Sequence, residues 1–469
     1  MKKMLSSDLI KQITAVQKAQ RKKSRSNNLN TIQVRLAALD SLKALLVENE
    51  TRWLEAMKKN LNKPRLEAYS SEIAILLNEI DYNRKNLKKW LKPKSKRRLL
   101  LTGLEKIKVT YQPFGSILVI SPWNYPLQLA LMPAIGALAA GNGIVLKPSE
   151  FTPNVSRLLA ELVPKYFKPD TLFVVQGDAD VAEKLTALPW DFLVFTGSSK
   201  TGRKVYESAA KNLTPTLLEL GGKNPCVLTT DAVNKENVRN VIWGKFLNAG
   251  QSCIAPDTVY VPQQKYADFL EIAKEVIIEF YGEEPEKSES YGRLIHEDHF
   301  KKVSSFLGEG TIYHGGRINE QDYYIEPTIL IAIDSNQSVL QEEIFGPILP
   351  VVPYQSTDQL VSHLKELPTP LVTYLFSEDS SWLKRMEMAL ESGSVSVNEV
   401  IVHAVSPNLP FGGKGQSGLG RYHGKNSFNS FTYEKPVYSR LNPSSFSPQY
   451  PPYTEKSLTI LRKIRRKIF

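Results

Sequence analysis

The chain has 469 residues, 42% hydrophobic and 23% charged, a composition typical of a folded protein of two or three domains that excludes disorder on a large scale. Its two cysteines form no CxxC pair and its six histidines form no HExxH motif, which argues against a disulfide framework and a metal site and favours a reducing compartment such as the cytoplasm. The net charge is +12, but no recognised nucleic-acid-binding module accompanies it, so we expect no nucleic-acid partner.

The first 90 residues are predicted to be helical. Apolar and charged residues recur there at three- and four-residue spacing, and glycine is absent. Lysines stand at the N-terminus as in a signal peptide, but no apolar segment follows them, so we expect no secretion signal.

From residue 111 onward, short apolar strands alternate with helices. The strands are predicted at 115–121, 143–149, 172–177 and 191–197, and the helices between them at 126–141, 153–167 and 178–188. This alternation predicts a doubly wound parallel sheet with helices on both faces, whose ligands bind beyond the carboxyl ends of the strands. It resumes after residues 217–222 and continues to about residue 400, which predicts a second α/β domain.

One apolar stretch, 127–146, is long enough to cross a membrane. It contains Pro133 and the turn residues Gly141 to Gly143, so a buried helix that leads into a strand is the favoured interpretation.

Polar residues follow the first two predicted strands. Asn124 could donate a hydrogen bond to a developing oxyanion, or it could cap the helix that begins near Pro126. Glu150, three residues after Lys147, could accept hydrogen bonds from a ribose diol. The alternative for Glu150 is an exposed turn, and from these residues alone it is the favoured interpretation.

A glycine-containing loop joins a strand to a helix at residues 197–202. The start of a helix offers free N–H groups and a partial positive charge, which suit a pyrophosphate. The loop is not a P-loop, because Arg203 and Lys204 follow it in place of Lys and Ser or Thr, and it is not GxGxxG either. It therefore does not identify a cofactor by itself. Its residues are Gly197, Ser198, Ser199, Lys200, Thr201 and Gly202.

Further along the chain, two residues are candidates for covalent chemistry. Cys253 lies in a loop of small residues after a predicted helix, which leaves space for a substrate beside the thiol, whereas Cys226 lies in a predicted strand and fits an inert core position. Glu219, between leucines at a strand end, is a candidate general base because partial burial would raise its pKa. The alternative for Glu219 is a place on the solvent face of an edge strand.

Basic residues cluster in two segments. Residues 84–98 include nine of them, and the C-terminal tail combines five more with Leu458, Leu461, Ile464 and Ile468 at helical spacing. A basic amphipathic end can lie on an anionic membrane surface, and a solvated tail is the equally weighted alternative.

The order of these signals resembles the aldehyde dehydrogenase superfamily, in particular a bacterial-type member of its class 3 (fatty and aromatic aldehyde) branch. The similar blocks cover most of the chain and are EIDY (79–82), SPWNYP (121–126), AAGNGIVLKPSE (139–150), FTGSSKTG (195–202), LELGGKNP (218–225), NAGQSCIAPD (248–257), QEEIFGPILP (341–350) and LPFGGKGQSGLGRYHGKNSF (409–428).

The resemblance assigns roles to the candidate residues. It implies that Cys253 is the nucleophile, that Glu219 is the general base, and that Asn124 and the Cys253 backbone N–H form the oxyanion hole. It implies a nicotinamide cofactor, NAD and as a further option NADP, held by several contacts. These are Lys147 and Glu150 at the adenine ribose, residues 197–202 at the pyrophosphate, Glu343 at the nicotinamide ribose and Phe345 at its ring.

The resemblance also implies an architecture. We expect an α/β fold with a doubly wound, Rossmann-like cofactor domain (1–91 and 114–219), an α/β catalytic domain (220–403), a small β bridging arm for oligomerisation (92–113 and 404–445) and a basic amphipathic tail (446–469). A homodimer is implied, in the cytoplasm, with the tail as a route to peripheral contact with the inner face of the membrane.

The expected activity is oxidation of a medium- or long-chain aliphatic or an aromatic aldehyde to its carboxylic acid through a cysteine thioester. Transfer of the acyl group to coenzyme A, or a basic binding protein on the same fold, are the alternatives. Two residues depart from the family pattern, Lys200 in the phosphate loop and Lys414 after the PFGG turn, and the first leaves the choice between NAD and NADP open.

Overall fold

The first 90 residues are helical in their described part, as the spacing of their apolar residues predicts. The structure is a computed structural model that describes residues 2–26, 30–95, 105–440 and 450–468. Leu76, Ile80 and Leu87 lie at helical spacing in the last of these helices and all three are buried, which is why the pattern forms a helix here. The elements are α1 (Lys2–Ser24), α2 (Ile32–Val47), α3 (Glu50–Leu61), α4 (Arg65–Ala68), the π-helical turn η1 (Tyr69–Ala74) and α5 (Ile75–Trp90).

The first sheet has the strand order β17-β7-β6-β3-β4-β5, and all of its strands are parallel except β17. Its strands are β3 (Ser116–Ile120), β4 (Gly143–Lys147), β5 (Leu172–Val174), β6 (Phe192–Thr196), β7 (Thr216–Glu219) and β17 (Gly418–Leu419), and the helices between them are α6 (Gln128–Ala140), α7 (Pro153–Tyr166), α8 (Ala179–Thr186) and α9 (Ser199–Ala210). Every predicted strand and helix of this region is present, which confirms the doubly wound α/β fold.

Side chains that alternate along the strands explain why helices cover both faces of this sheet. Ile117 and Val119 of β3 belong to a core with α2, α5, α6 and α7, and all thirteen residues of α6 are buried. Leu118 and Ile120 point the other way, into a core with α1, α8 and α9. The apolar stretch 127–146 is therefore a central helix and a central strand, as predicted.

The second sheet has the order β10-β13-β14-β9-β8-β15-β16, parallel except for β10. Its strands are β8 (Pro225–Leu228), β9 (Thr258–Pro262), β10 (Thr311–His314), β13 (Thr328–Ile331), β14 (Ile348–Tyr354), β15 (Val372–Phe376) and β16 (Ser394–Val397), and the helices around it are α10 (Lys235–Phe246), α11 (Tyr266–Tyr281), α12 (Glu297–Ser305), α13 (Ser338–Gln341), α14 (Thr357–Glu366) and α15 (Ser380–Ala389). A two-stranded ribbon, β11 (Ile318–Asn319) with β12 (Tyr324–Ile325), lies outside this sheet.

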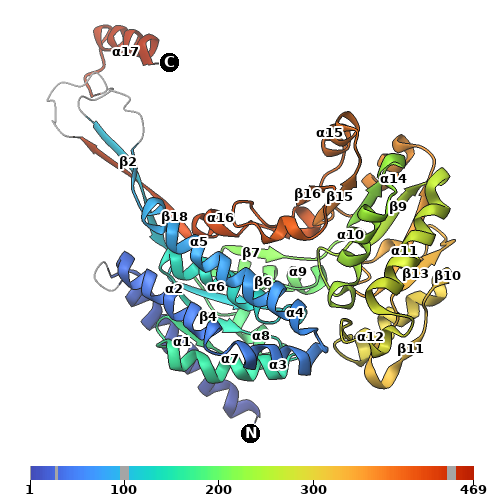
Figure 1. Cartoon of the computed structure of the whole chain (residues 1–469). Helices are drawn as coiled ribbons and strands as arrows, with labels where there is room; N and C mark the ends of the chain where they lie inside the picture. The colour runs from blue at the N-terminus through green and yellow to red at the C-terminus, as the bar shows by residue number, and fades with distance from the viewer. Residues whose placement is uncertain (1, 27–29, 96–104, 441–449, 469) are drawn as a thin grey trace.

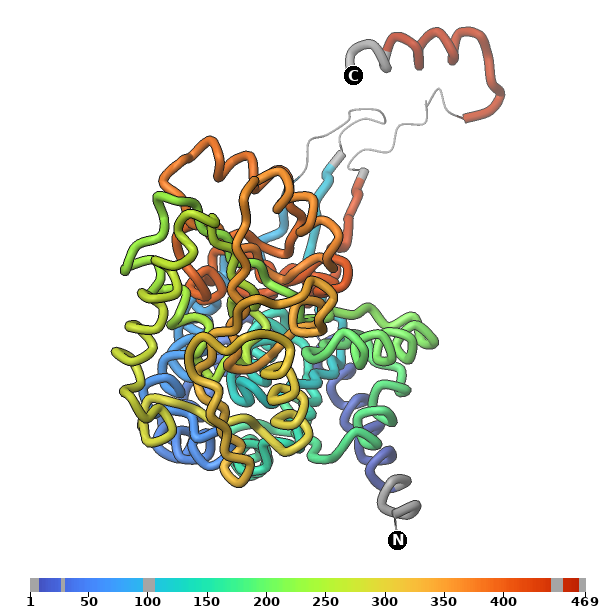
Figure 2. Tube along the Cα trace, turned by 90° about the vertical axis from the view of Figure 1, so that its right-hand side faces the viewer, coloured from blue at the N-terminus to red at the C-terminus, as the bar shows by residue number. Residues whose placement is uncertain are grey.

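A third, antiparallel sheet forms an arm. β1 (Lys94–Ser95) and β18 (Thr432–Arg440) flank β2 (Glu105–Pro113), and β18 pairs with β2 from Thr432 opposite Pro113 to Arg440 opposite Glu105. Figure 1 shows this arm projecting away from both larger sheets, after the short helix α16 (Gly424–Ser430). The C-terminal helix α17 (Glu455–Ile468) lies beyond the arm in both views (Figures 1 and 2).

Among the described residues, no helix is both long and apolar enough to cross a membrane.

Parallel strands place the candidate residues at one edge of the first sheet. β3, β4, β6 and β7 end at Ile120, Lys147, Thr196 and Glu219, so the loops that follow them open at the same edge. The cysteine loop lies in the other half of the chain, between α10 and β9, and faces this edge.

Candidate active site

The loop that carries Cys253 is held in an unusual backbone conformation. Asn248, Ala249 and Gly250 have positive φ angles of 53°, 51° and 74° at the end of α10. A side chain at Gly250 would overlap the carbonyl oxygen of Gly346, so this turn requires glycine. The Asn224 side chain donates to the Cys253 carbonyl oxygen at 2.7 Å and thereby fixes the position of the thiol-bearing residue.

The Cys253 thiol lies near two buried carboxyl groups. Burial raises the pKa of the thiol, and the charges of Glu343 and Glu219 raise it further. A thiol in this environment keeps its proton until a base accepts it, and these carboxylates are the bases at hand. Cys226 has its pKa raised by burial alone and is fully buried on β8, in agreement with an inert core position.

Glu219 is a buried carboxyl group without a hydrogen-bond partner. It is 3% exposed, and neither of its carboxyl oxygens accepts a hydrogen bond in the described part of the structure. Burial raises its pKa well above the ordinary value, and the Arg421 charge opposes that rise. β7 pairs with β6 on one side and with β17 on the other, so the alternative of a solvent-facing edge strand is wrong.

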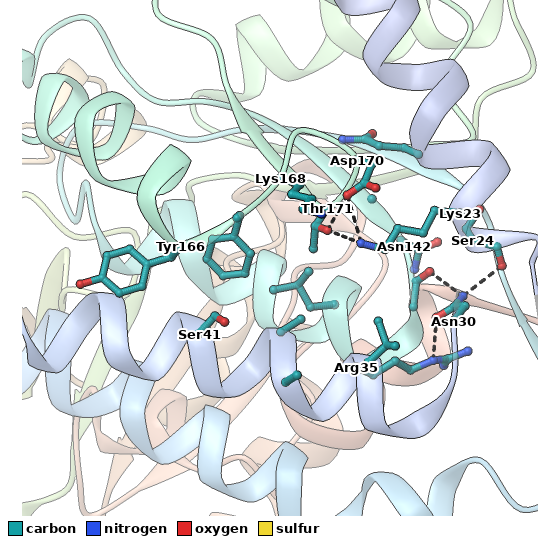
Figure 3. A pocket seen from close by; sticks show the side chains of 18 residues that line it. Lys23, Ser24, Asn30, Arg35, Ser41, Asn142, Tyr166, Lys168, Asp170 and Thr171 are labelled. Atoms are coloured by element: carbon teal, nitrogen blue, oxygen red, sulfur yellow. Dashed lines mark hydrogen bonds and ion pairs between the residues drawn. The ribbon is translucent and has the colours of Figure 1, made fainter. Parts of the chain in front are cut away.

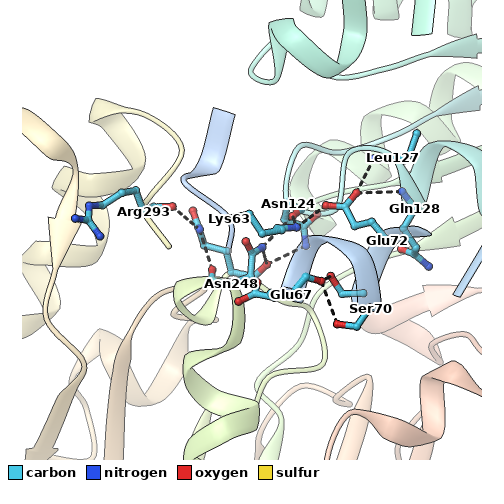
Figure 4. A network of polar contacts seen from close by, with 11 residues as sticks. Lys63, Glu67, Ser70, Glu72, Asn124, Leu127, Gln128, Asn248 and Arg293 are labelled. Atoms are coloured by element: carbon cyan, nitrogen blue, oxygen red, sulfur yellow. Dashed lines mark hydrogen bonds and ion pairs between the residues drawn. The ribbon is translucent and has the colours of Figure 1, made fainter. Parts of the chain in front are cut away.

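Asn124 lies beside the cysteine loop. Its side chain donates to the Gln251 carbonyl oxygen at 3.1 Å, and its own carbonyl oxygen accepts from Asn248 at 2.9 Å and from Lys63 at 3.0 Å (Figure 4). The alternative of a helix cap is wrong, because the cap of α6 is Leu127 and the Leu127 N–H is taken by Glu72. An amide group has two N–H donors, so one remains for another acceptor.

A cavity of about 550 Å³ opens beside Cys253. Its wall is mostly apolar, and the polar groups in it lie on several different segments. The apolar lining residues are Ile75, Leu129, Leu247, Ile254, Ile401, Ala404, Val405 and Phe411, and the polar ones are Ser71, Tyr125, Gln128, Ser252, Tyr422 and His423. Such a wall suits a ligand with an apolar body and one reactive end.

Glu343 lies against a glycine that makes room for it. A side chain at Gly221 would overlap the Glu343 carboxylate, and one carboxylate oxygen of Glu343 is buried without a partner. Burial raises the pKa of Glu343 to about 8, with a further contribution from Asp257. An unpaired carboxylate oxygen in a closed space is available to accept from a hydroxyl group.

Phe345 is at the centre of an aromatic cluster that joins the two halves of the chain. Its φ angle is 52°, and its carbonyl oxygen contacts His299 Nε2 at 2.9 Å. Trp123, from the loop after β3, lies 5.4 Å from the Phe345 ring and 5.2 Å from the His299 ring, centre to centre. Burial lowers the pKa of His299 to about 4, so this ring is neutral at physiological pH.

The remaining predicted residues follow β4 and β6. The buried Lys147 forms an ion pair with the half-buried Glu150 at 2.5 Å. Ser198 caps α9, since its hydroxyl oxygen accepts from the Thr201 N–H, and Lys200 and Thr201 are exposed in the first turn. Gly197 precedes this cap, and Ser199 donates to the Gln416 carbonyl oxygen. Gly202 has a different reason to be glycine, because a side chain there would overlap Leu220.

Several residues around the site were not predicted from the sequence. Lys63 and Asn248 donate to the backbone carbonyl oxygen of Asn124, and Glu72 accepts from the Leu127 N–H. Arg421 and Tyr422 lie near Glu219 and Cys253. Asn248 stands in the same small-residue block as Cys253, which was a usable signal, whereas Lys63 and Glu72 lie in a helical region like any other surface pair. In the described ranges there is no group of three His, Cys, Asp or Glu residues that could hold a metal ion.

Known proteins are similar to this chain over most of its length. Residues 6–437 match the model of the aldehyde dehydrogenase family. The chain is 47% identical, over 86% of its length and 89% of the relative, to the 4,4'-diapolycopene-4,4'-dial dehydrogenase of Cytobacillus firmus. It is 37% identical, over 92% and 96%, to the dimeric NADP-preferring aldehyde dehydrogenase of Mus musculus. The substrate-bound structure of Staphylococcus aureus AldH superposes with a TM-score of 0.93 at 38% identity, over 96% of this chain and 99% of that one.

Proposed function

The chain belongs to the aldehyde dehydrogenase family, in its class 3 branch, and since it oxidises an aldehyde to a carboxylic acid with NAD(P), we propose that it does so through a thioester on Cys253. The observation that carries this proposal is the unpaired carboxyl group of Glu219, which is buried near a thiol that lines an apolar cavity. A buried acid with a raised pKa and free oxygens is suited to accept a proton near neutral pH.

The first half of the reaction uses the thiol and two hydrogen-bond donors. A carboxylate accepts the proton of Cys253, and the sulfur attacks the aldehyde carbon to form a thiohemiacetal. The free N–H of the Asn124 amide and the backbone N–H of Cys253 donate to the oxygen that becomes negatively charged. Bound NAD(P) would supply the hydride acceptor at this point, and Cys253 would hold the resulting acyl group as a thioester.

The second half of the reaction uses Glu219. Its carboxylate removes a proton from water, the hydroxide adds to the thioester carbon, and the carbon–sulfur bond breaks to release the acid and the free thiolate. The same two donors stabilise the second oxyanion, because it develops at the same oxygen.

We propose that the edge of the first sheet and the loop before β14 together hold the dinucleotide. We assign the adenine ribose to Lys147 and Glu150, the pyrophosphate to the capped start of α9 at residues 197–202, the nicotinamide ribose to Glu343 and the ring to Phe345. The supporting observations are the free Glu343 oxygen, the space kept by Gly221 and the exposed first turn of α9. The exposed Lys200 adds positive charge at the assigned pyrophosphate position.

The substrate class follows from the cavity wall. We assign medium- to long-chain aliphatic or aromatic aldehydes, because most of the wall beside Cys253 is apolar. A similar protein, from Cytobacillus firmus, is named as a dehydrogenase of 4,4'-diapolycopene-4,4'-dial, and a dialdehyde substrate is consistent with this class.

The division of the chain and its assembly are part of the same proposal. We assign cofactor binding to 1–91 and 114–219, catalysis to 220–403, bridging between subunits of a homodimer to 92–113 and 404–445, and contact with the inner face of the membrane to the tail, 446–469, of a cytoplasmic enzyme. The projecting arm and the amphipathic α17 support these assignments (Figure 1).

A panel of aldehydes tests the proposal. Purified protein is incubated with NAD or NADP, with and without coenzyme A, and with linear aldehydes of increasing length. We expect acid formation without coenzyme A and a kcat/KM that rises by up to about fourfold per methylene group, because each buried methylene contributes about 0.8 kcal/mol. Cys253→Ser, which retains the cofactor residues, is the control and should be inactive. A rate that requires coenzyme A would favour the acyl-transferring alternative.

A further inference from the structure

A buried ion pair lies directly behind Asn124. Lys63 and Glu72 are both inaccessible to solvent, and Lys63 Nζ lies 2.5 Å from a Glu72 carboxylate oxygen (Figure 4). Neither residue touches the cavity beside Cys253. A pair of this kind rarely improves stability over apolar side chains of the same size, because both charges lose their hydration. The contacts of this ion pair therefore need an explanation other than stability.

Lys63 directs its donors at the residues of the active-site turn. One N–H donates to Glu72 and another to the Asn124 carbonyl oxygen, at 3.0 Å. The ammonium group also lies 4.1 Å from the centre of the Tyr125 ring. A charged donor makes a stronger and more directional hydrogen bond to a carbonyl than a neutral donor does.

Glu72 fixes the other end of the same turn. Its second carboxylate oxygen accepts from the Leu127 N–H at 2.8 Å and the Gln128 N–H at 3.2 Å, which are the first free donors of α6. Glu72 belongs to η1, the π-helical turn between α4 and α5, and wide turns of this type occur often at functional sites. The ion pair thus holds Asn124 and Gln128 in a fixed relation.

The Asn124 side chain is held from the opposite side by the cysteine loop. The Gln251 carbonyl oxygen accepts from Asn124 at 3.1 Å and from Asn248 at 3.2 Å, and Asn248 also donates to the Asn124 carbonyl oxygen. With its backbone fixed by Lys63 and one N–H used on Gln251, the Asn124 amide has a single direction for its second N–H.

We propose that Lys63 and Glu72 are positioning residues that hold the free N–H of Asn124 where the oxyanion forms. This inference rests on the proposed function, since it requires Asn124 to be the oxyanion donor. Neither residue touches the substrate, so each acts through Asn124. A shift of about 1 Å in a catalytic group can cost roughly 10²-fold in rate, so a distant pair can govern the reaction in this way.

Lys63→Met tests the proposal in two reactions. The first is the pre-steady-state rate of NADH formation, and the second is hydrolysis of 4-nitrophenyl acetate, which needs the thiol and the oxyanion donors but no cofactor. We expect both rates to fall by roughly 10- to 100-fold, with the KM for aldehyde and the Kd for NAD changed less than about twofold. Lys43→Met is the matched control, because Lys43 forms an ion pair with Asp81 at the surface and should leave both rates unchanged.

A double-mutant cycle with Asn124→Ala separates positioning from general destabilisation. If Lys63 acts through Asn124, Lys63→Met lowers the rate of the Asn124→Ala variant by less than about twofold. Independent, multiplicative effects would overturn the inference and leave the role of Asn124 intact. An Asn124→Ala enzyme with the full rate would instead overturn the proposed oxyanion donor and the inference with it. Should Lys63→Met not fold, Glu72→Gln, which keeps an oxygen for the start of α6, completes the same cycle.

Discussion

At the scale of single residues, the proposed mechanism separates two proton transfers that involve neighbouring groups. Cys253 loses its proton before the hydride step, and Glu219 accepts a proton from water after it. Both groups have raised pKa values because both are buried, and neither carboxyl oxygen of Glu219 has a hydrogen-bond partner among the described residues. The two roles can therefore be separated by a substitution that removes one charge.

Glu219→Gln should stop the reaction at the acyl-enzyme. The amide has nearly the shape of the acid but cannot accept a proton, so the thioester forms and is not hydrolysed. Rapid mixing with aldehyde and NAD should give a burst of NADH of about one per site, followed by a steady rate at least about 10²-fold below that of the wild type. Intact-protein mass spectrometry should detect the acyl group on Cys253. Rapid release of acid by this variant would remove Glu219 from the role.

A second buried acid, Glu79, predicts how stability depends on pH. It is 3% exposed, and one of its oxygens accepts from the Gly424 N–H at 2.7 Å and from Asn83 at 2.8 Å. Burial raises its pKa from 4.5 to about 7. Between these pH values the folded protein binds this proton and the unfolded chain does not, so stability falls as the pH rises through the window, by an amount on the order of 3 kcal/mol.

Glu79→Gln removes that dependence. The variant has no proton to lose, so its Tm should decrease less than that of the wild type between about pH 5 and about pH 7, and the difference should stay constant above that range. Scanning calorimetry at several pH values measures this directly. Glu207→Gln, at an exposed position, is the control and should follow the wild type. Parallel curves for all three proteins would contradict the assigned pKa.

At the scale of elements, small residues decide whether two loops can approach each other. The loop after β7 contains Gly221, which faces the loop that carries Glu343. Gly221→Ala places a methyl group where the Glu343 carboxylate lies, so this side chain must move away from the assigned ribose position. We expect the Kd for NAD to rise by about 10-fold or more, as for the loss of one charge-assisted hydrogen bond. Isothermal titration calorimetry measures that change.

The control for this prediction is Gly308→Ala, because nothing lies near a side chain at that position. It should bind NAD as the wild type does. An unchanged Kd for Gly221→Ala as well would mean that Glu343 does not contact the cofactor.

The same elements explain what the sequence could predict. β6 and α9 were predictable because an apolar run followed by a capping serine is a local signal, and both are present. β17, an antiparallel addition to the first sheet, was not predicted, since Gly418 pairs with Glu219 from almost two hundred residues away and has no local strand pattern. Glu219 itself was chosen correctly as a buried acid, but its burial depends on this distant strand.

The polar residues around Asn124 mark the limit of prediction at the site. Cys253, Glu219 and Asn124 stand in distinctive blocks, whereas Lys63 and Glu72 stand among ordinary charged helix residues. Only the packing of α3, η1 and α6 brings these two charges together out of water. A sequence pattern records which residues are apolar, but it does not record which charges meet in the interior.

At the scale of the whole molecule, a cavity larger than the one at Cys253 lies far from the chemistry in the described part of the chain. It has a volume of about 1260 Å³, part of it open to solvent, and lies between the start of the arm and residues 24–26, 30 and 35. A second one, of about 710 Å³, lies between the end of α1, α2 and α7, where Lys23 bonds to Asp170 and Arg35 to Asn30 (Figure 3). The polar groups that line this second cavity already bind one another, so its size does not identify it as the reaction site. The smaller cavity is the one that contains the candidate nucleophile, Cys253.

The C-terminal helix makes a prediction about the whole molecule. α17 lies beyond the arm and away from both large sheets, with Leu458 and Leu461 each 39% exposed (Figure 2). The chain from residue 456 onward contains six Lys or Arg residues and no acid. Each such residue near an anionic surface contributes about 1 kcal/mol, and a bilayer also accepts the apolar side chains. The long apolar aldehydes assigned as substrates partition into the same bilayer.

Deletion of residues 456–469 should therefore abolish binding to vesicles that contain anionic lipid. Co-sedimentation with such vesicles measures the bound fraction, which should also fall for the full chain at high salt. The deletion leaves both sheets, the cavity and the arm in place, so kcat/KM for a short, water-soluble aldehyde should not change. Analytical ultracentrifugation should find the same mass per particle for both proteins, apart from the deleted residues, as expected if the proposed dimer does not need the tail. Equal vesicle binding by the two proteins would remove the tail from this role and leave the catalytic assignments untouched.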